Sequence, residues 1–230
     1  MLINEDALLK LNRAHIAVFG LGGVGSWCAE ALARSGIGEL TLIDCDSFSV
    51  SNINRQLNAL ESTIGKSKVA VTAQRLKDIN PEIIIHPLEG LYNAESRETF
   101  LSDYDYVADC IDLVSCKLDL IVSCISRKIP IISALGTGNK LDASKMCISD
   151  ISKTSGCALA RVMRKELRGR GITHHTVVFS PEEPLEPEQV EAPPPGRRSI
   201  PGSVVWVPAT AGFLMAQHIV LTLIQNGEDK

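Results

Sequence analysis

The clearest chemical signal in the sequence is a glycine-rich segment, GLGGVG at residues 20–25. This segment follows an apolar run and lies at the start of a helical pattern. Glycines at such a turn let the backbone approach a phosphate closely, and the free N–H groups at a helix N-terminus bind anionic oxygens. The spacing predicts a nucleotide-binding turn formed by Gly20, Gly22, Gly23, Val24 and Gly25.

An acidic residue, Asp44, closes the next apolar run. A carboxylate about 20 residues after such a turn accepts hydrogen bonds from a ribose. This pair of motifs fits dinucleotide dehydrogenases as well as enzymes that use ATP, so the class of nucleotide stays open at this point.

Two cations favour ATP over a nicotinamide cofactor. The loop after Asp44 reads SNINRQ at residues 51–56 and contains Arg55, and Lys68 opens the next helical pattern. Attack at the α-phosphate of ATP builds charge there and on the departing pyrophosphate, whereas hydride transfer needs no such cations. Arg55 can clamp oxygens with its planar fork, and Lys68 can act as a point charge.

Two carboxylates, Asp109 and Asp112, follow the fourth apolar run. Ligands of open α/β sheets bind at the carboxyl ends of the strands, where a carboxylate can hold Mg²⁺ against phosphates. Capping the turn after the strand is an equally good role for Asp109.

The elements that must position these residues alternate along the chain. Apolar runs typical of buried strands cover residues 15–19, 40–43, 83–86, 106–110 and 129–134. Helical patterns cover residues 5–12, 24–35, 66–79, 94–101 and 114–128. This alternation predicts an α/β fold with a Rossmann-like, doubly wound and mainly parallel sheet.

The last third of the chain is expected to extend this sheet. Further strands are predicted at 145–150, 176–180 and 204–207, and helices at about 159–168 and at 209–225. Residues 181–201 hold seven of the eleven prolines, so we expect an extended loop there. The interpretation is one domain over residues 1–230, with a nucleotide-binding core at 14–137 and a C-terminal α/β extension at 138–230.

Composition restricts the environment and the partners. A net charge of −4 excludes general electrostatic attraction to nucleic acid, although a local basic patch remains open. The start MLINEDALLK is unlike a signal peptide, and no apolar stretch reaches the roughly 20 residues of a membrane span. We expect a cytoplasmic protein without a membrane span. No two of the seven cysteines are separated by two residues, so no zinc site built from CxxC pairs is expected.

A local basic patch is predicted on one helix. Four cations recur at i, i+3, i+4 and i+7, namely Arg161, Arg164, Lys165 and Arg168. Residues on the core side of this helix would be Leu159, Val162, Met163 and Leu167, and Arg170, Arg197 and Arg198 would extend the patch. Such cations position an RNA through its phosphates without reading its sequence. An ordinary solvated helix face is the alternative.

The motifs GLGGVG, LIDCD, SNINRQ, GKSKV and DCID resemble, in order and spacing, the adenylation domain of the ubiquitin-activating-enzyme superfamily, which includes the ThiF-type adenylyltransferases of sulfur carriers. The segments at 150–172 and 197–216 are similar to the tRNA threonylcarbamoyladenosine dehydratases. The resemblance implies an ATP site of Gly20, Gly22, Gly23, Val24, Gly25, Asp44, Asp46, Asn52, Asn54, Arg55, Gln56, Lys68, Cys110, Ile111 and Asp112. It also implies that Arg55, Lys68 and Asp112 are catalytic, and that Asp112 holds Mg²⁺.

The resemblance implies an ATP-dependent enzyme that adenylates the carboxylate of the threonylcarbamoyl group on a tRNA adenosine beside the anticodon. An internal nitrogen then closes a ring and releases AMP. Implied cofactors are ATP and Mg²⁺ without zinc, and implied partners are tRNA, sulfur-relay proteins such as a cysteine desulfurase, and a second copy of the chain. The patch from Arg161 to Arg168 would bind the tRNA.

Two other functions remain open. One is an adenylyltransferase for the C-terminal glycine of a ubiquitin-like sulfur carrier, although such enzymes usually carry two CxxC pairs. The other is a nicotinamide-dependent oxidoreductase. Some relatives have a cysteine in the C-terminal third, but none follows Cys157 here, so no covalent cysteine step is expected. Arg55 and Lys68 are expected to face the surface without nucleotide.

Overall fold

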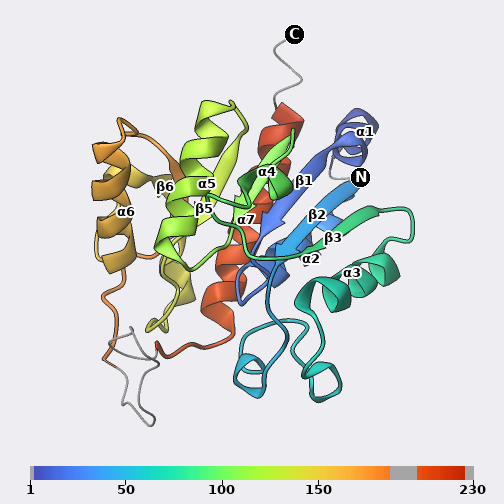
Figure 1. The fold of residues 1–230 in the computed structure, drawn as a ribbon, viewed down its shortest axis with the longest axis horizontal. Helices are drawn as coiled ribbons and strands as arrows, with labels where there is room; N and C mark the ends of the chain where they lie inside the picture. The colour runs from blue at the N-terminus through green and yellow to red at the C-terminus, as the bar shows by residue number, and fades with distance from the viewer. Residues whose placement is uncertain (1–2, 187–200, 226–230) are drawn as a thin grey trace.

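The central feature of the molecule is a seven-stranded sheet, seen here in a computed structural model that describes residues 3–186 and 201–225. Its order is β3-β2-β1-β4-β5-β7-β6 (Figure 1). The strands are β1 (His15–Phe19), β2 (Glu39–Asp44), β3 (Ile84–Glu89), β4 (Tyr106–Asp109), β5 (Ile131–Ala134), β6 (Cys147–Asp150) and β7 (Thr176–Phe179). All neighbours are parallel except β6, which is antiparallel to β7. The predicted fold class is confirmed.

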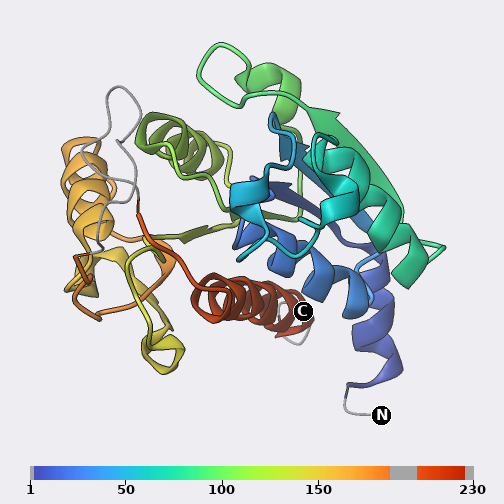
Figure 2. The same ribbon diagram turned by 90° about the horizontal axis from the view of Figure 1, so that it is seen from below.

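Helices cover both faces of this sheet. They are α1 (Glu5–Arg13), α2 (Gly25–Arg34), α3 (Lys68–Ile79), α4 (Arg97–Phe100), α5 (Val114–Ser126), α6 (Ala158–Gly169) and α7 (Trp206–Gln225). Figure 2 shows α5 and α7 on opposite faces of the sheet. One apolar core lies between the sheet and α1, α2, α3 and α7, and a second lies between the sheet and α4, α5 and α6.

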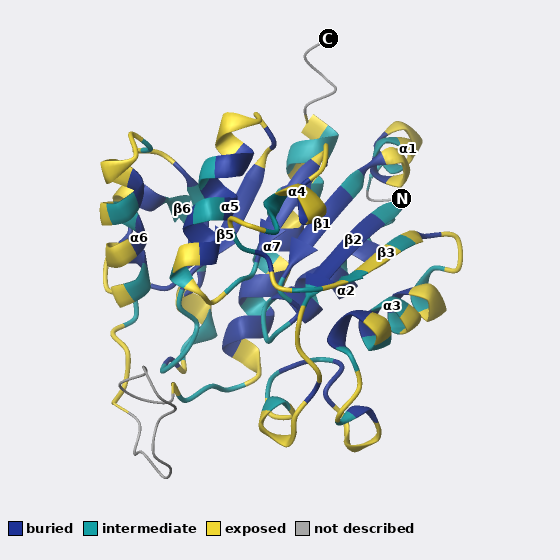
Figure 3. Cartoon of the chain, in the orientation of Figure 1, coloured by how far each residue is buried: buried dark blue, intermediate teal, exposed yellow. Residues whose placement is uncertain are grey.

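The strand order places the crevice for a ligand at β1 and β4. The chain leaves β1 toward β2 and β3 on one side, and then returns to place β4 on the other side of β1. Ligands of open α/β sheets bind at such a switch point, beyond the carboxyl ends of the strands. The central strands β1 and β4 are buried, whereas the edge strand β3 is partly exposed along its length (Figure 3).

The strand predicted at 204–207 is wrong, because α7 already begins at Trp206. Pro208 lies in its first turn, where the missing N–H of proline costs nothing. Of the four residues in the predicted strand only Val207 is buried, and it continues at helical spacing into the buried residues at 211, 215 and 219. By length and composition α7 is apolar enough to cross a membrane. In this fold it packs as a core helix against α2 and the sheet.

The remaining predicted elements are present, but α4 is shorter than the helix predicted at 94–101. The side-chain oxygen of Asn93 accepts hydrogen bonds from the N–H groups of Glu95 and Ser96, at 2.8 and 3.0 Å, and holds this segment in a turn. Within the predicted loop at 181–201, residues 181–186 and 201 have no regular secondary structure, and residues 187–200 lie outside the described part of the chain.

Candidate functional site

The glycine turn lies at the carboxyl end of β1, where α2 begins. Gly20 has a φ of +89°, and a Cβ atom there would lie 2.8 Å from the carbonyl oxygen of Cys110. A Cβ atom at Gly25 would lie 1.8 Å from the carbonyl oxygen of Gly20. Both positions therefore require glycine, and the turn packs directly on the segment that follows β4.

Asp44 connects the end of β2 to the glycine turn. Its Oδ2 accepts a hydrogen bond from the N–H of Leu21 at 2.6 Å, and its Oδ1 accepts one from the N–H of Asp46 at 2.8 Å. A carboxylate oxygen has more than one lone pair, so each oxygen can still accept a hydroxyl from a ribose.

Lys68 lies beside these two carboxylates. Its Nζ is 2.8 Å from Oδ2 of Asp46 and 4.0 Å from Oδ1 of Asp44. The hydrogen bond from Lys68 lowers the pKa of the Asp46 carboxyl. The backbone N–H of Lys68 also donates to the carbonyl oxygen of Asp46 at 3.0 Å. The expectation that Lys68 faces the surface is wrong, because only 4% of this residue is exposed to solvent.

Arg55 is half-buried against the same turn. Its Cγ would lie 3.3 Å from a Cβ atom at Gly23, and its Nη1 donates to the carbonyl oxygen of Ser51 and to Oδ1 of Asn54, at 2.8 and 2.9 Å. Burial lowers the pKa of its guanidinium. The indole N–H of Trp27 on α2 donates to the carbonyl oxygen of Arg55 at 3.2 Å. The loop is therefore fixed to the helix that the glycine turn opens.

Two asparagines of this loop hold it in place through hydrogen bonds, and Gln56 has a side-chain oxygen that is unpaired in the described part of the chain. Oδ1 of Asn52 accepts the N–H of Ser49 at 3.1 Å, and Nδ2 of Asn54 donates to the carbonyl oxygen of Ser203 at 3.0 Å. Gln56 is buried, and its Oε1 has no hydrogen-bond partner within the described residues. Buried polar atoms are nearly always paired, so the unpaired Oε1 fits a site that a polar ligand completes. Nε2 of the same amide lies 3.8 Å from the position that a Cβ atom would take at Gly22, so the amide adjoins the glycine turn.

The segment after β4 contains one structural carboxylate and one exposed carboxylate. Asp109 is fully buried, and its Oδ2 lies 2.7 Å from Nζ of Lys117, which is fully buried on α5. Its Oδ1 accepts the N–H of Ile111 at 3.1 Å, which is the capping role considered from the sequence. Asp112 is exposed. It is therefore the carboxylate of this pair that suits Mg²⁺, a hard cation that prefers carboxylate and water oxygens.

Sequence reasoning missed Lys117, although a lysine within the apolar helix pattern at 114–121 was a usable signal. Cys110 and Ile111 reach the site mainly through their backbone, which packs against Gly20. A hydrogen bond with the Cys28 thiol, together with burial, raises the pKa of Cys110, so this cysteine stays a neutral thiol.

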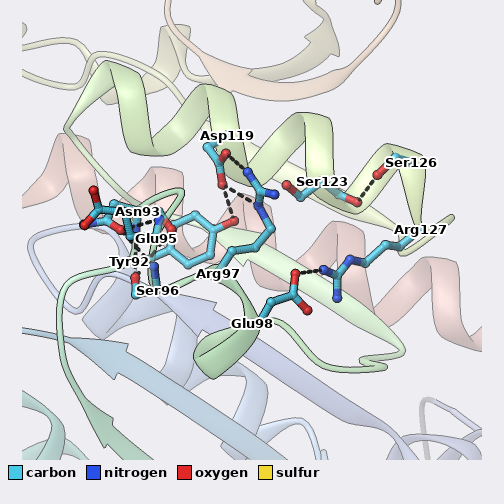
Figure 4. Close-up of polar contacts among 10 residues, drawn as sticks. All are labelled: Tyr92, Asn93, Glu95, Ser96, Arg97, Glu98, Asp119, Ser123, Ser126 and Arg127. Carbon is cyan, nitrogen blue, oxygen red and sulfur yellow. Dashed lines mark hydrogen bonds and ion pairs between the residues drawn. The ribbon is translucent and has the colours of Figure 1, made fainter.

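A groove of about 1250 Å³ runs beside Asp112 and was not predicted. It lies between the turn before α4, the helix α5 and the helix α6, and its lining includes Asp112, Leu113, Cys116, Asp119, Val162 and Glu166. One wall is fixed by Asp119, whose Oδ2 accepts hydrogen bonds from the Tyr92 hydroxyl at 2.8 Å and from Nε of Arg97 at 3.1 Å (Figure 4). Four separate segments of the sequence form this groove, the fourth being Pro201, so no local pattern indicates it.

The basic face predicted on α6 forms one surface hollow, lined by Arg161, Arg164, Lys165, Arg168 and Gly169. Three of these cations are exposed. Arg164 is half-buried, because its Nη1 donates to the carbonyl oxygen of Thr154 at 2.7 Å.

Two details of this face differ from the prediction. Val162, assigned to the core side, is 45% exposed and lines the groove, because α6 packs on the core through Ala160, Met163 and Leu167. Arg170 pairs with Glu166 at 2.8 Å, and Arg197 and Arg198 lie outside the described residues.

Comparison with known proteins gives a family match over the whole chain. The model of the ThiF family matches residues 1–230. The tRNA threonylcarbamoyladenosine dehydratase of Bacillus subtilis is 41% identical over 239 residues, which cover 99% of this chain and 94% of the relative. Crystal structures of E. coli tRNA N6-threonylcarbamoyladenosine dehydratase, TcdA, in complex with ATP and with AMP each superpose with a TM-score of 0.90. They are 35% identical and cover 100% of this chain and 93% of that one.

Proposed function

Since the chain belongs to the ThiF family and, within it, to the tRNA threonylcarbamoyladenosine dehydratases, we propose that it uses ATP to dehydrate the threonylcarbamoyl group on the tRNA adenosine beside the anticodon. The ATP and AMP complexes of the E. coli relative support a reaction that passes through an adenylate. The observation that carries the proposal is the group of charged side chains around the glycine turn, formed by Asp44, Lys68 and Arg55.

The proposed reaction has two steps. A carboxylate oxygen of the threonylcarbamoyl group attacks the α-phosphorus of ATP, the bond to the bridging oxygen of the β-phosphate breaks, and pyrophosphate leaves. An internal nitrogen of the same group then attacks the acyl carbon and gives up its proton, and AMP leaves with the former carboxylate oxygen. The nucleoside therefore loses the elements of one water, whose oxygen leaves in AMP, while ATP is converted to AMP and pyrophosphate.

The side chains supply position and charge for the first step. Asp44 would accept hydrogen bonds from the ribose and so fix the α-phosphate above the glycine turn. Lys68 and Arg55 would stabilise the negative charge that builds on the phosphates in the transition state. Asp46 and Asp44 hold the Lys68 ammonium beside the turn before ATP binds, which lowers the reorganisation that the step requires.

Asp112 would hold a Mg²⁺ ion, which when bound neutralises charge on the phosphate oxygens. The groove beside Asp112 would give the acceptor group a route to the nucleotide. Because the basic face of α6 flanks this groove, Arg161, Lys165 and Arg168 would contact RNA phosphates while the modified base enters it.

The proposal includes a homodimer that forms through the exposed apolar residues of α7, among them Trp206 and Phe213. It also includes a cytoplasmic location, which rests on the proposed tRNA substrate. Association with sulfur-relay proteins rests on the family resemblance alone.

The test is a reaction of purified protein with ATP, Mg²⁺ and tRNA that carries threonylcarbamoyl adenosine. Mass analysis of the digested nucleosides should show a product lighter by one water, with one AMP released per product. Folded protein that gives no such product, and that exchanges pyrophosphate only when a ubiquitin-like protein ending in Gly-Gly is added, would assign the chain to the sulfur-carrier adenylyltransferases instead.

A further inference from the structure

We propose that His15, Glu39 and His86 form a binding site for a divalent transition-metal ion such as Zn²⁺. One ligand atom from each of these residues lies within 4.8 Å of the other two. The site is at the amino ends of the strands, at the edge of the sheet opposite to the glycine turn. The five residues of β1 separate the two edges by about 13 Å.

The register of the sheet brings the three side chains to one face. His15 on β1 pairs with Glu39 on β2, and Thr41 on β2 pairs with His86 on β3. Residues two apart on a strand point to the same side, so Glu39 and Thr41 share a face, and the two histidines share it with them. The three strands lie side by side in Figure 1, with β3 at the edge of the sheet.

The distances already approach those of a metal site. Oε1 of Glu39 is 3.5 Å from Nδ1 of His15 and 2.7 Å from Nε2 of His86. With metal–ligand bonds of about 2.0–2.1 Å and tetrahedral angles, ligand atoms lie about 3.4 Å apart. The first pair fits this spacing. The second pair needs an opening of about 0.7 Å to reach it. The side chain of His86 is 46% exposed on an edge strand, so it can turn by this amount.

A hydrogen bond behind His15 orients it for this role. Its Nε2 lies 2.8 Å from Oγ1 of Thr41, a buried residue. Metal-bound histidines usually donate their second ring N–H to an oxygen, which fixes both the tautomer and the ring plane. With the proton on Nε2 and directed at Thr41, Nδ1 presents its lone pair toward Glu39.

A further carboxylate lies close to the site. Oδ2 of Asp105 accepts the backbone N–H of His15 at 2.8 Å, so Asp105 and Glu39 both place negative charge near a bound cation. Two imidazoles and a carboxylate suit Zn²⁺, Co²⁺ or Ni²⁺ better than Mg²⁺ or Ca²⁺. Three protein ligands at a partly exposed position leave a fourth position for water. Bound metal would join the edge strand β3 to β2 and β1.

The test uses two metal probes on the purified full chain. Titration with Co²⁺ should saturate at one ion per chain and give visible bands of nitrogen and oxygen ligation without thiolate charge transfer. Zn²⁺ should raise the Tm, because the ion binds the folded state selectively. His86→Asn and Glu39→Gln should each weaken binding more than about tenfold, and Thr41→Val should weaken it about tenfold because the oxygen that orients His15 is removed.

Two matched variants decide between this site and other ligands. His174→Asn removes an exposed histidine that pairs with Asp150 at 3.3 Å, and it should leave binding unchanged. Cys45→Ser removes the thiol of a second group, since ligand atoms of Asp44, Cys45 and Asp46 also lie within 4.8 Å of one another. Binding that persists in His86→Asn, binding that disappears in Cys45→Ser, or no binding by the wild-type chain would each overturn the proposal. Equal Tm values of metal-free wild type and His86→Asn check that the fold is retained.

Discussion

At the scale of single residues, the two cations of the nucleotide site differ in how far the fold depends on them. Arg55 bonds only to its own loop through its side chain, within the contacts described. Lys68 is buried beside the carboxylates of Asp44 and Asp46, and Asp44 also holds the glycine turn. The sequence indicated a phosphate role for both, but burial depends on how β2 and α3 fold together, which spacing along the chain does not reveal.

Arg55→Ala should lower kcat about 10²- to 10³-fold, because one preorganised charge on a transition state contributes this much. The Tm should change little, since the side chain is half-buried and its partners are loop atoms. Steady-state kinetics and a melting curve measure the two effects. Arg13→Ala, an exposed arginine on α1, is the matched control and should leave both unchanged. Near-normal turnover of Arg55→Ala would contradict the assigned role.

Lys68→Met should lower both turnover and stability. Removing the ammonium leaves Asp44 and Asp46 facing each other without a cation, at a cost of about 1–3 kcal/mol of unfolding free energy. Adding Asp46→Asn to Lys68→Met removes one of these charges, so denaturant unfolding should show recovered stability while turnover stays low. A double variant that recovers both, or neither, would show that Lys68 does not combine these two roles.

Because His175 is buried in its neutral form, we expect the free energy of unfolding to fall in mild acid. It is buried, its Nε2 lies 2.8 Å from Oγ of Ser133, and burial lowers its pKa to about 4. Between pH 6.5 and 4 the unfolded chain therefore binds a proton that the folded chain does not, and the free energy of unfolding falls as pH falls through this window. The full effect approaches about 3 kcal/mol.

Denaturant unfolding at several pH values measures this dependence. His175→Gln should flatten the profile between pH 6.5 and 4, whereas His174→Gln, the exposed neighbour, should leave it as in the wild type. Equal slopes in all three proteins would mean that other groups cause the acid sensitivity.

At the scale of elements, the sequence predicts β1 with its exact bounds, because five residues of nearly continuous burial also form a continuous apolar run. The strand predicted at 204–207 was wrong for a different reason. There an apolar run belongs to a helix whose buried side and exposed side are both hydrophobic, so periodicity gives no signal. The short α4 depends on side-chain hydrogen bonds from Asn93, which a propensity pattern does not contain.

The basic face of α6 predicts a change in RNA binding that depends on salt. Replacing Arg161, Lys165 and Arg168 with Ala should weaken tRNA binding and lower the slope of log K against log salt, by about 0.7–0.9 for each phosphate that the variant no longer neutralises. Binding of ATP should be unchanged. Filter binding at several salt concentrations measures the slope. A double variant of exposed cations elsewhere, Arg13→Ala with Lys77→Ala, should bind like the wild type, and equal slopes in all three proteins would assign the α6 face to solvent.

At the scale of the whole molecule, the sheet keeps two sets of polar residues apart. The glycine turn, Asp44 and Asp112 lie at carboxyl ends of strands, and His15, Glu39 and His86 lie toward the amino ends or on the open edge. The motifs predicted the first set because each follows a strand. The second set could not be predicted, because it depends on the order and register of β1, β2 and β3.

We expect two copies of the chain to associate through the outer side of α7, where large apolar side chains are exposed. Trp206, Phe213 and Leu221 are 51%, 48% and 44% exposed, on the side away from the core positions Val207 and Met215. Phe213 also contacts Trp27, with ring centroids 5.8 Å apart, so this apolar surface continues onto α2. Because each of these side chains is already about half buried, covering the exposed half contributes roughly 1 kcal/mol each.

Light scattering should therefore give twice the chain mass of 24.9 kDa for the wild type and the single chain mass for Phe213→Asp. Leu9→Asp, which changes a residue of similar exposure on α1, should keep the doubled mass. Because α7 and the loop of Arg55 both adjoin the glycine turn, the monomeric variant should also lose turnover. A wild type of single chain mass, or a Phe213→Asp variant of doubled mass, would place any interface elsewhere.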